Sequence, residues 1–444
     1  MKQGFHQLKI NLILQRLLCI LLTIYSVCGI FGCSADTHDK NPDTAQVQLP
    51  WFDGNSYSLQ HVSLSTIKDM VTLRGSSARF LMAPGEANGQ LVGVAPKIKT
   101  MRTNDGVYIP EDYLSVQLLS LYAHFEKLAD LDKQLGLGQL ISNWPRQETV
   151  AVSVQVSDPS GQMGTDNAMY TGDYDAYLFL PYTRSDLPSS VNAGVIGHEH
   201  FHSLFYQKFI KASASKYPFS TQPASTRSDT AHPIAQILQS MGLPILMPTE
   251  SHIDAKSAEA DQKTDQKTVV INFGNGQGVS TLSAATARDQ YHAFLLRSLN
   301  EGLADIWGWV YSGDTKFVQR SAPEFDSRNL NYVWRFSLTA SQISNLSLRT
   351  KMSANTPILD PSIYQVGTVY ANRLWQAVQV SLLTSGKTEL QARQELAQGI
   401  MRAIMKLQTE FIALDTNSNL DPIRPLELLQ AELPELKINL NVSQ

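Results

Sequence analysis

The segment VIGHEHFHSLF, residues 195–205, places three histidines and one glutamate within five consecutive positions. On an α-helix each residue turns by about 100°, so His198 and His202 would lie one turn apart on one face, where two imidazoles can converge on one ion. His200 would point to the opposite side with apolar residues, and we interpret it as a half-buried core histidine. The spacing therefore predicts a helix with one metal-binding face.

Glu199 has a different place in this pattern. Because it directly follows His198, it cannot comfortably bind the same ion, and it is placed instead to contact water in an open coordination position. Catalytic zinc sites have three protein ligands and leave a fourth position for water. The segment alone could also be a polar stripe on a surface helix, so a third ligand is needed to decide between the two interpretations.

The segment LNEGLADIWGW, residues 299–309, offers that ligand. Glu301 can supply a carboxylate from a second helix, and Asp305, one turn further on the same face, can accept the spare N–H of a ligating imidazole. Taken alone, the two carboxylates would more often belong to a solvated helix face. Apolar residues surround them here, so burial without a partner would be costly. We predict one zinc ion per chain, bound by His198, His202 and Glu301.

The N-terminus predicts export from the cytoplasm. Basic residues precede an apolar run at 17–31, which is typical of a secretory signal peptide over residues 1–32 and too short to favour a membrane span. The run ends at IFGC, which resembles a bacterial lipobox with an unusual Phe31 before the glycine. We predict that Cys33 is lipidated and anchors the protein to a membrane of the bacterial cell envelope, at the outer membrane or cell surface. The alternative is an ordinary cleaved signal peptide and a secreted protein.

Composition limits the other partners. No cysteine follows Cys33, which would carry the lipid, so His, Asp and Glu are left to bind any metal. The net charge of −4 and the charged fraction of 17% give no basic stripe, and we expect no nucleic-acid partner. The segment DTNSNLD, residues 415–421, begins like a calcium loop, but leucines replace its turn glycine and its bidentate glutamate. We interpret it as a polar turn and expect no calcium.

The 444 residues suit one large domain or two lobes. Apolar periodicity predicts a helix over 112–135, and alternation predicts strands over 149–156 and 175–182. A segment rich in Ser, Thr, Gln and Pro predicts an inserted lobe or loop over about 212–287. We divide the mature chain into a polar tether (33–48), an N-terminal α+β lobe (49–190), the zinc-site helices with their insertion (191–312) and a helical C-terminal lobe (313–444).

The motifs resemble those of a known family. HEHFH followed by NEGLADIWG resembles the gluzincin zinc metallopeptidases, both thermolysin-like and fungalysin-like. The segment NAMYTGDYDAYLFLPY, residues 167–182, is similar to the edge strand and following strand that precede the zinc helix in that family. The segment YQVGTVYANRLW, residues 364–375, is similar to a downstream fungalysin pattern. The resemblance implies an α+β zincin-like fold, with a mixed sheet and its edge strand over a mostly helical lower lobe and the active-site helix between them.

The resemblance also implies roles for individual residues. Glu199 would be the general base of a metalloendopeptidase: it would take a proton from zinc-activated water and pass it to the leaving amine. Asp305 would orient His198, and Asn300 would orient His202. Spacing alone places Glu199 near an open coordination position and Asp305 near a ligating imidazole. The resemblance adds the proton-transfer role of Glu199, the pairing of Asp305 with His198 and the role of Asn300.

Substrate contacts are implied in the same way. Asn167 and Ala168 would bind an extended peptide or protein substrate along the edge strand. Tyr364 stands where fungalysins carry an oxyanion-stabilising histidine; its phenol could donate that hydrogen bond, or it could be a packed aromatic. The insertion could be a specificity lobe, a lid or a passive surface segment. The rival interpretation is a catalytically silent, zinc-stabilised binding or adhesion lipoprotein, which would have no need of Glu199.

Overall fold

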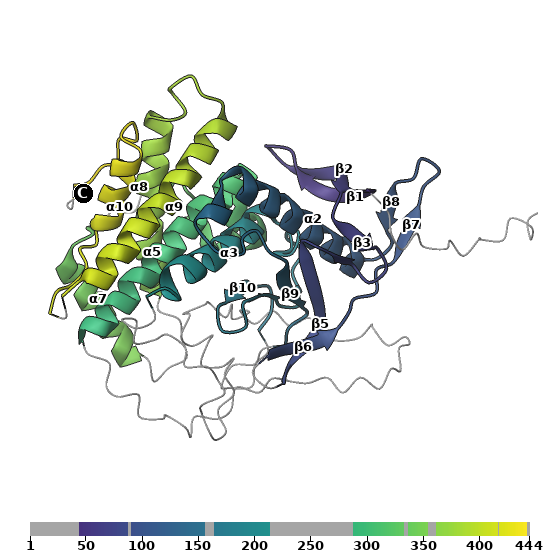
Figure 1. Ribbon diagram of the computed structural model, residues 1–444, viewed down its shortest axis with the longest axis horizontal. Coiled ribbons are helices and arrows are strands. Elements are labelled where there is room, and N and C mark those ends of the chain that lie inside the picture. The colour runs from purple at the N-terminus through teal and green to yellow at the C-terminus, as the bar shows by residue number, and fades with distance from the viewer. Residues whose placement is uncertain are drawn as a thin grey trace, which may run out of the picture.

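The computed structural model describes residues 44–87, 90–155, 164–213, 287–332, 336–353, 361–415 and 417–441. Sheets fill the N-terminal half and helices fill most of the C-terminal half, which confirms the predicted α+β class (Figure 1). The predicted signal peptide, Cys33 and nearly all of the predicted insertion lie outside these residues. Within them, no helix combines the length and the apolar character needed to cross a lipid bilayer.

A five-stranded mixed sheet lies nearest the candidate site. Its strands, in spatial order, are β10 (Ala168–Thr171), β11 (Ala176–Phe179), β9 (Glu148–Val152), β5 (Ala78–Ala87) and β6 (Gln90–Val94). The three central strands run parallel, and both edge strands are antiparallel to their neighbours. Strands β9 and β11 coincide with two predicted strands, although each is shorter than predicted. The edge position of β10 agrees with the predicted edge strand.

A four-stranded sheet contains β2 (Tyr57–Leu64), β1 (Ala45–Phe52), β8 (Tyr108–Pro110) and β7 (Thr100–Arg102), and a small ribbon pairs β3 (Ile67–Asp69) with β4 (Arg74–Gly75). The predicted start of the fold at residue 49 was wrong. Ala45 and Val47 are buried at alternate positions and pair with β2. This alternation of apolar and polar residues covers too few positions to stand out from the polar sequence before it. Residues 45–48, which were predicted to belong to the polar tether, are therefore part of strand β1.

Helix α2 (Tyr113–Gln134) confirms the helix predicted over 112–135. Asp112 caps its first turn, because the Asp112 carboxylate accepts a 2.7 Å hydrogen bond from the backbone N–H of Ser115. The helix ends just before Gly136, whose φ of 69° no longer continues a right-handed helix. Its apolar face, which includes Leu118 and Phe125, packs in one core with strands of both larger sheets.

The C-terminal half packs around the long helix α5. Its helices are α5 (Ala287–Ser312), α6 (Phe317–Ser321), α7 (Ala340–Ser353), α8 (Pro361–Val380), α9 (Glu389–Ala413) and α10 (Arg424–Glu432), with a 3₁₀ segment η4 (Pro323–Arg328). Trp307 and Trp309 on α5 are almost completely buried, and the Trp309 ring packs edge-on against Trp375 with centroids 4.9 Å apart. Helix α3 (Ala193–Phe205) lies between this helical half and the sheets, and a π-helical turn η2 (Tyr206–Ile210) extends it (Figure 1).

Candidate metal centre

The start of α3 is fixed by Asn192. Its side-chain oxygen accepts hydrogen bonds from the backbone N–H groups of Gly194 and Val195, at 3.1 and 3.4 Å. Its amide group donates to the carbonyl oxygen of Phe317 on α6, at 2.7 Å. An N-cap fixes where the helix begins and so which residues share a face. The capped start therefore sets the direction in which the residues of HEHFH point.

Helices α3 and α5 cross closely because glycines lie at the crossing. A Cβ atom on Gly308 would lie 2.7 Å from the carbonyl oxygen of Gly194 and 2.6 Å from the Phe317 ring. Contacts this short do not occur between real side chains, so the two backbones approach as only glycine allows. The close crossing brings Glu301 on α5 against the histidines of α3.

Helix α8 approaches the same part of α5 through another glycine pair. A Cβ atom on Gly302 would lie 2.2 Å from the carbonyl oxygen of Gly367, and one on Gly367 would lie 3.0 Å from the Cβ of Glu301. The backbone of α8 therefore packs directly against the residue that follows Glu301. This contact holds Tyr364, one turn earlier on α8, close to the site.

We expect Gly302→Ala to destabilise the protein by about 1–3 kcal/mol, because the added methyl group meets backbone that cannot rotate away. Thermal or denaturant unfolding of the folded domain measures this. Gly399→Ala on α9 is the matched control: its added methyl group would lie 2.5 Å from the side-chain Cδ1 of Leu433, and a side chain can move where backbone cannot. Alanine also favours the helix, so Gly399→Ala should cost less stability than Gly302→Ala. Equal stability of Gly302→Ala and wild type would mean that α5 and α8 are further apart than described.

His198, His202 and Glu301 come together with all three side chains buried, and among the described residues they form a group that could bind a metal ion. The two Nε2 atoms are 3.0 Å apart. The Glu301 oxygens lie 3.5 Å from Nε2 of His198 and 3.7 Å from Nε2 of His202. Ligand atoms arranged tetrahedrally around zinc are about 3.4 Å from one another, given bonds of about 2.0–2.2 Å. The spacing of these three residues fits zinc.

Asp305 lies behind the first histidine. Its Oδ1 is 3.0 Å from Nδ1 of His198, on the side of the ring away from His202. A proton on Nδ1 leaves the lone pair of Nε2 directed into the group of ligands. Burial alone would lower the pKa of His198, but its contacts with Asp305 and Glu301 outweigh burial and raise the pKa to about 9. Metal binding would therefore displace a proton from this ring.

The second histidine is in a different environment. Burial lowers the pKa of His202 to about 4, and the charge of Glu301 and the side chain of Asn300 oppose this only in part. The ring is therefore neutral, the form that a metal ligand requires. Burial would raise the pKa of Glu301, but the two histidines and Arg328 lower it overall, so the carboxylate is ionised. The donor set is two imidazoles and one carboxylate, which suits zinc.

Arg328 was missed by the sequence reasoning. It ends η4, and its guanidinium lies 2.6 Å from Oδ1 of Asp305 and 3.5 Å from Oε2 of Glu301. It also lies over the ring of Tyr364, 4.8 Å from the centroid. Several buried carboxylates need a nearby cation. The predicted burial of Glu301 and Asp305 was therefore the one signal that could have indicated a nearby arginine. Its irregular segment carries no periodic pattern that could have placed it.

Tyr364 is half-buried, and its ring packs against the guanidinium of Arg328, which in turn contacts Glu301 and Asp305. Burial, reinforced by the charges of Glu301 and Glu199, raises its pKa well above the ordinary value. The phenol therefore keeps its proton and can act as a hydrogen-bond donor. Its proposed oxyanion role remains a prediction.

Glu199 is buried and is hydrogen-bonded to the sheet. Its Oε2 accepts a 2.8 Å bond from the backbone N–H of Tyr170 on edge strand β10. Burial raises the pKa of Glu199 to about 7, although the charge of His198 opposes the rise. A bound dication nearby would favour the carboxylate form. A carboxylate with a pKa near 7, beside three possible metal ligands, can chemically both take and give a proton.

Of the two predicted substrate contacts, Ala168 begins the same edge strand and Asn167 directly precedes it. The side-chain oxygen of Asn167 accepts a bond from the N–H of Ala168, and the carbonyl oxygen of Asn167 accepts a bond from Leu180. The register pairs Tyr170 with Tyr177, a position at which the N–H of Tyr170 points away from the sheet and toward α3. The edge strand therefore faces the candidate metal centre.

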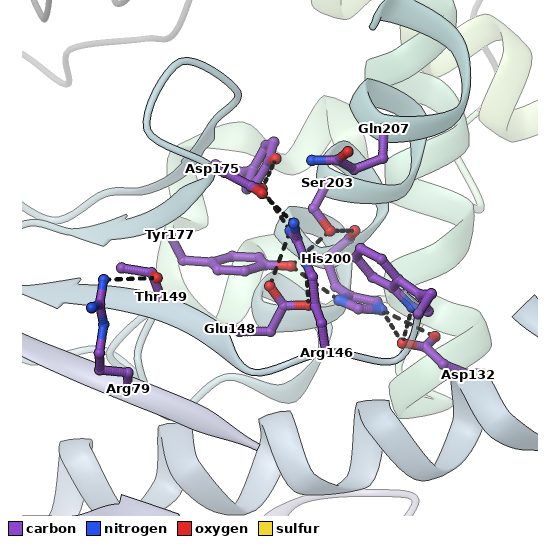
Figure 2. Close-up of polar contacts among 12 residues, drawn as sticks. Arg79, Asp132, Arg146, Glu148, Thr149, Asp175, Tyr177, His200, Ser203 and Gln207 are labelled. Atoms are coloured by element: carbon purple, nitrogen blue, oxygen red, sulfur yellow. Dashed lines mark hydrogen bonds and ion pairs between the residues drawn. The ribbon is translucent and has the colours of Figure 1, made fainter. Parts of the chain in front are cut away.

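His200 lies on the far side of α3, as predicted, but it is completely buried and not half-buried. Its Nε2 is 3.0 Å from a carboxylate oxygen of Asp132 on α2, and its Nδ1 is 3.1 Å from the Tyr177 hydroxyl. These partners are far apart in the sequence, so local periodicity could not indicate them. Figure 2 shows His200 within a larger polar network.

No protein-family model matches this chain, and neither does any curated protein sequence. Function therefore has to be inferred from the residues of the site.

Proposed function

We propose that this protein is a zinc-dependent metalloendopeptidase of the gluzincin type. The observation that supports this best is that three buried possible ligands from two helices meet beside a second carboxylate, that of Glu199, which is hydrogen-bonded to the adjacent sheet edge. A site that only stabilised a fold with zinc would have no need of Glu199. The ordered contact of that side chain favours an enzyme over the silent binding lipoprotein.

The bound ion and the residues of the protein would supply different parts of the chemistry. Zinc, when bound by His198, His202 and Glu301, supplies a Lewis acid and activates water at neutral pH. Glu199 would accept a proton and return it to the leaving amine. Arg328 and Tyr364 present hydrogen-bond donors beside the ligands, where negative charge would develop on a substrate carbonyl. An extended peptide would lie along the outer edge of β10.

Peptide-library cleavage by the purified protein tests this proposal. We expect cleavage that stops when a zinc chelator is added and returns when zinc is restored. The absence of cleavage by protein with zinc confirmed at the site would favour the silent binding lipoprotein instead.

We also propose that the protein is anchored to the cell envelope through lipid on Cys33, which lies outside the described residues. Cys33→Ser should move the protein from the membrane fraction to the soluble fraction, or block its maturation, because the acyl chains would no longer be attached. Cell fractionation with mass spectrometry of the mature N-terminus measures this. Soluble wild-type protein with a processed terminus elsewhere would contradict the lipid anchor.

A further inference from the structure

We propose that Tyr170 and the ion pair of Asp175 with Arg146 form a positioning device for Glu199. This inference rests on the proposed function, in which Glu199 moves protons. The device acts through the backbone of strand β10, so none of its side chains needs to touch substrate.

Tyr170 donates two hydrogen bonds, one from its backbone and one from its side chain. Its backbone N–H donates to Oε2 of Glu199 at 2.8 Å, and its phenol donates to Oδ1 of Asp175 at 2.5 Å. The side chain is almost completely buried. Because one residue carries both bonds, the position of the phenol determines where the N–H meets the base.

Asp175 is itself held from two directions. It lies in the turn between β10 and β11, and both of its carboxylate oxygens contact the guanidinium of Arg146, one of them at 2.6 Å (Figure 2). Bidentate pairs of this kind fix orientation as well as distance. Arg146 also lies over the ring of Trp144 and within 3.2 Å of Glu148. The guanidinium therefore has little freedom to move.

The network returns to α3. The indole N–H of Trp144 donates to Asp132 at 2.6 Å, and Asp132 contacts His200, the residue that follows Glu199. One polar network therefore contacts α3 from two sides. Glu199 is bonded to the sheet edge at β10, and His200 contacts Asp132 of α2.

The position of β10 explains why such a device is useful. An edge strand has only one neighbour, so half of its backbone groups take no part in the sheet and its outer side has no partner strand. The β10–β11 hairpin alone does not fix the distance from Tyr170 to α3. The Asp175–Arg146 pair ties the end of that hairpin to the segment before β9, a central strand. Small displacements of catalytic groups are costly, so this support matters for rate.

We test the device with Tyr170→Phe, which keeps the ring and removes the phenol. We expect kcat to fall about tenfold, as for other supporting contacts around metal sites, with KM and zinc content unchanged. Asp175→Asn keeps a residue type that accepts the left-handed backbone of Asp175 (φ 50°) and removes the charge that pairs with Arg146, so kcat should again fall with KM and zinc content unchanged. Tyr122→Phe is the matched control, because it also loses a buried phenol contact, with Thr66, but has no link to Glu199.

A second readout does not depend on turnover. Amide hydrogen exchange, resolved to single residues by fragmentation mass spectrometry, should become faster at Tyr170 in both variants. Exchange at Met169, whose N–H lies on the side of β10 that pairs with β11, should change much less. The inference is overturned if the wild type is active and Tyr170→Phe matches Tyr122→Phe in both readouts. An inactive wild type with faster exchange in the variants would instead contradict the proposed function and leave the positioning contact supported.

Discussion

Glu199→Gln should lower kcat/KM by about 10²–10⁴-fold while the protein stays folded and keeps its zinc. Glutamine has nearly the same size and can keep a contact with the N–H of Tyr170, but it cannot accept a proton. Loss of the same group as proton donor to the leaving amine would add to the effect. Steady-state cleavage of a peptide substrate measures the change, together with zinc analysis of the purified variant.

The control for this prediction is Glu126→Gln. Glu126 on α2 is also buried, and its carboxylate accepts hydrogen bonds from Ser65 and Thr66 in the turn between β2 and β3. Its substitution should lower stability through those contacts without a comparable loss of turnover in the folded protein. Turnover by Glu199→Gln at the wild-type rate would show that Glu199 is not the base.

Glu301→Ala should weaken zinc binding by more than 100-fold. Loss of a supporting residue typically costs roughly 10–100-fold in metal affinity, and the loss of a direct ligand should exceed that. Two imidazoles and water make a poor zinc site. Removal of the Glu301 carboxylate also removes a negative charge that lies 3.5 Å from the guanidinium of Arg328, so the positive charge of Arg328 would repel the ion more strongly. Competition with a chromogenic chelator measures the affinity.

Glu324→Ala is the matched control for this substitution. It removes an exposed glutamate that pairs with Arg184 on the protein surface, so the change in net charge is the same. Its effect on zinc affinity should be small because solvent screens an exposed charge. Unchanged zinc affinity in Glu301→Ala would mean that the third ligand has been misassigned.

The ligand group was the part of the site that the sequence could predict. Helix geometry is local and regular, so a spacing of four residues places His198 and His202 on one face whatever the rest of the chain does. The apolar setting of Glu301 and Asp305 then indicated that their helix faces inward. The structure brings these residues together with burial and spacing that fit one ion.

Contacts between distant segments could not be predicted in this way. Arg328 is the last residue of the short 3₁₀ segment η4, which has no periodic pattern, and the partner of His200 belongs to another helix. The bond from Tyr170 to Glu199 uses a backbone N–H, which every residue except proline carries, so the residue type gives no signal. The strand at Ala45 was missed because its alternation merges with polar neighbours.

The most direct test of the central claim is to locate the metal in crystals of the protein. X-ray diffraction measured on both sides of the zinc absorption edge should show one anomalous peak per chain, bounded by Nε2 of His198, Nε2 of His202 and the carboxylate of Glu301. This peak should disappear in crystals of Glu301→Ala grown with the same zinc concentration. A zinc-loaded protein whose peak lies elsewhere, or which shows no peak between these three side chains, would contradict it.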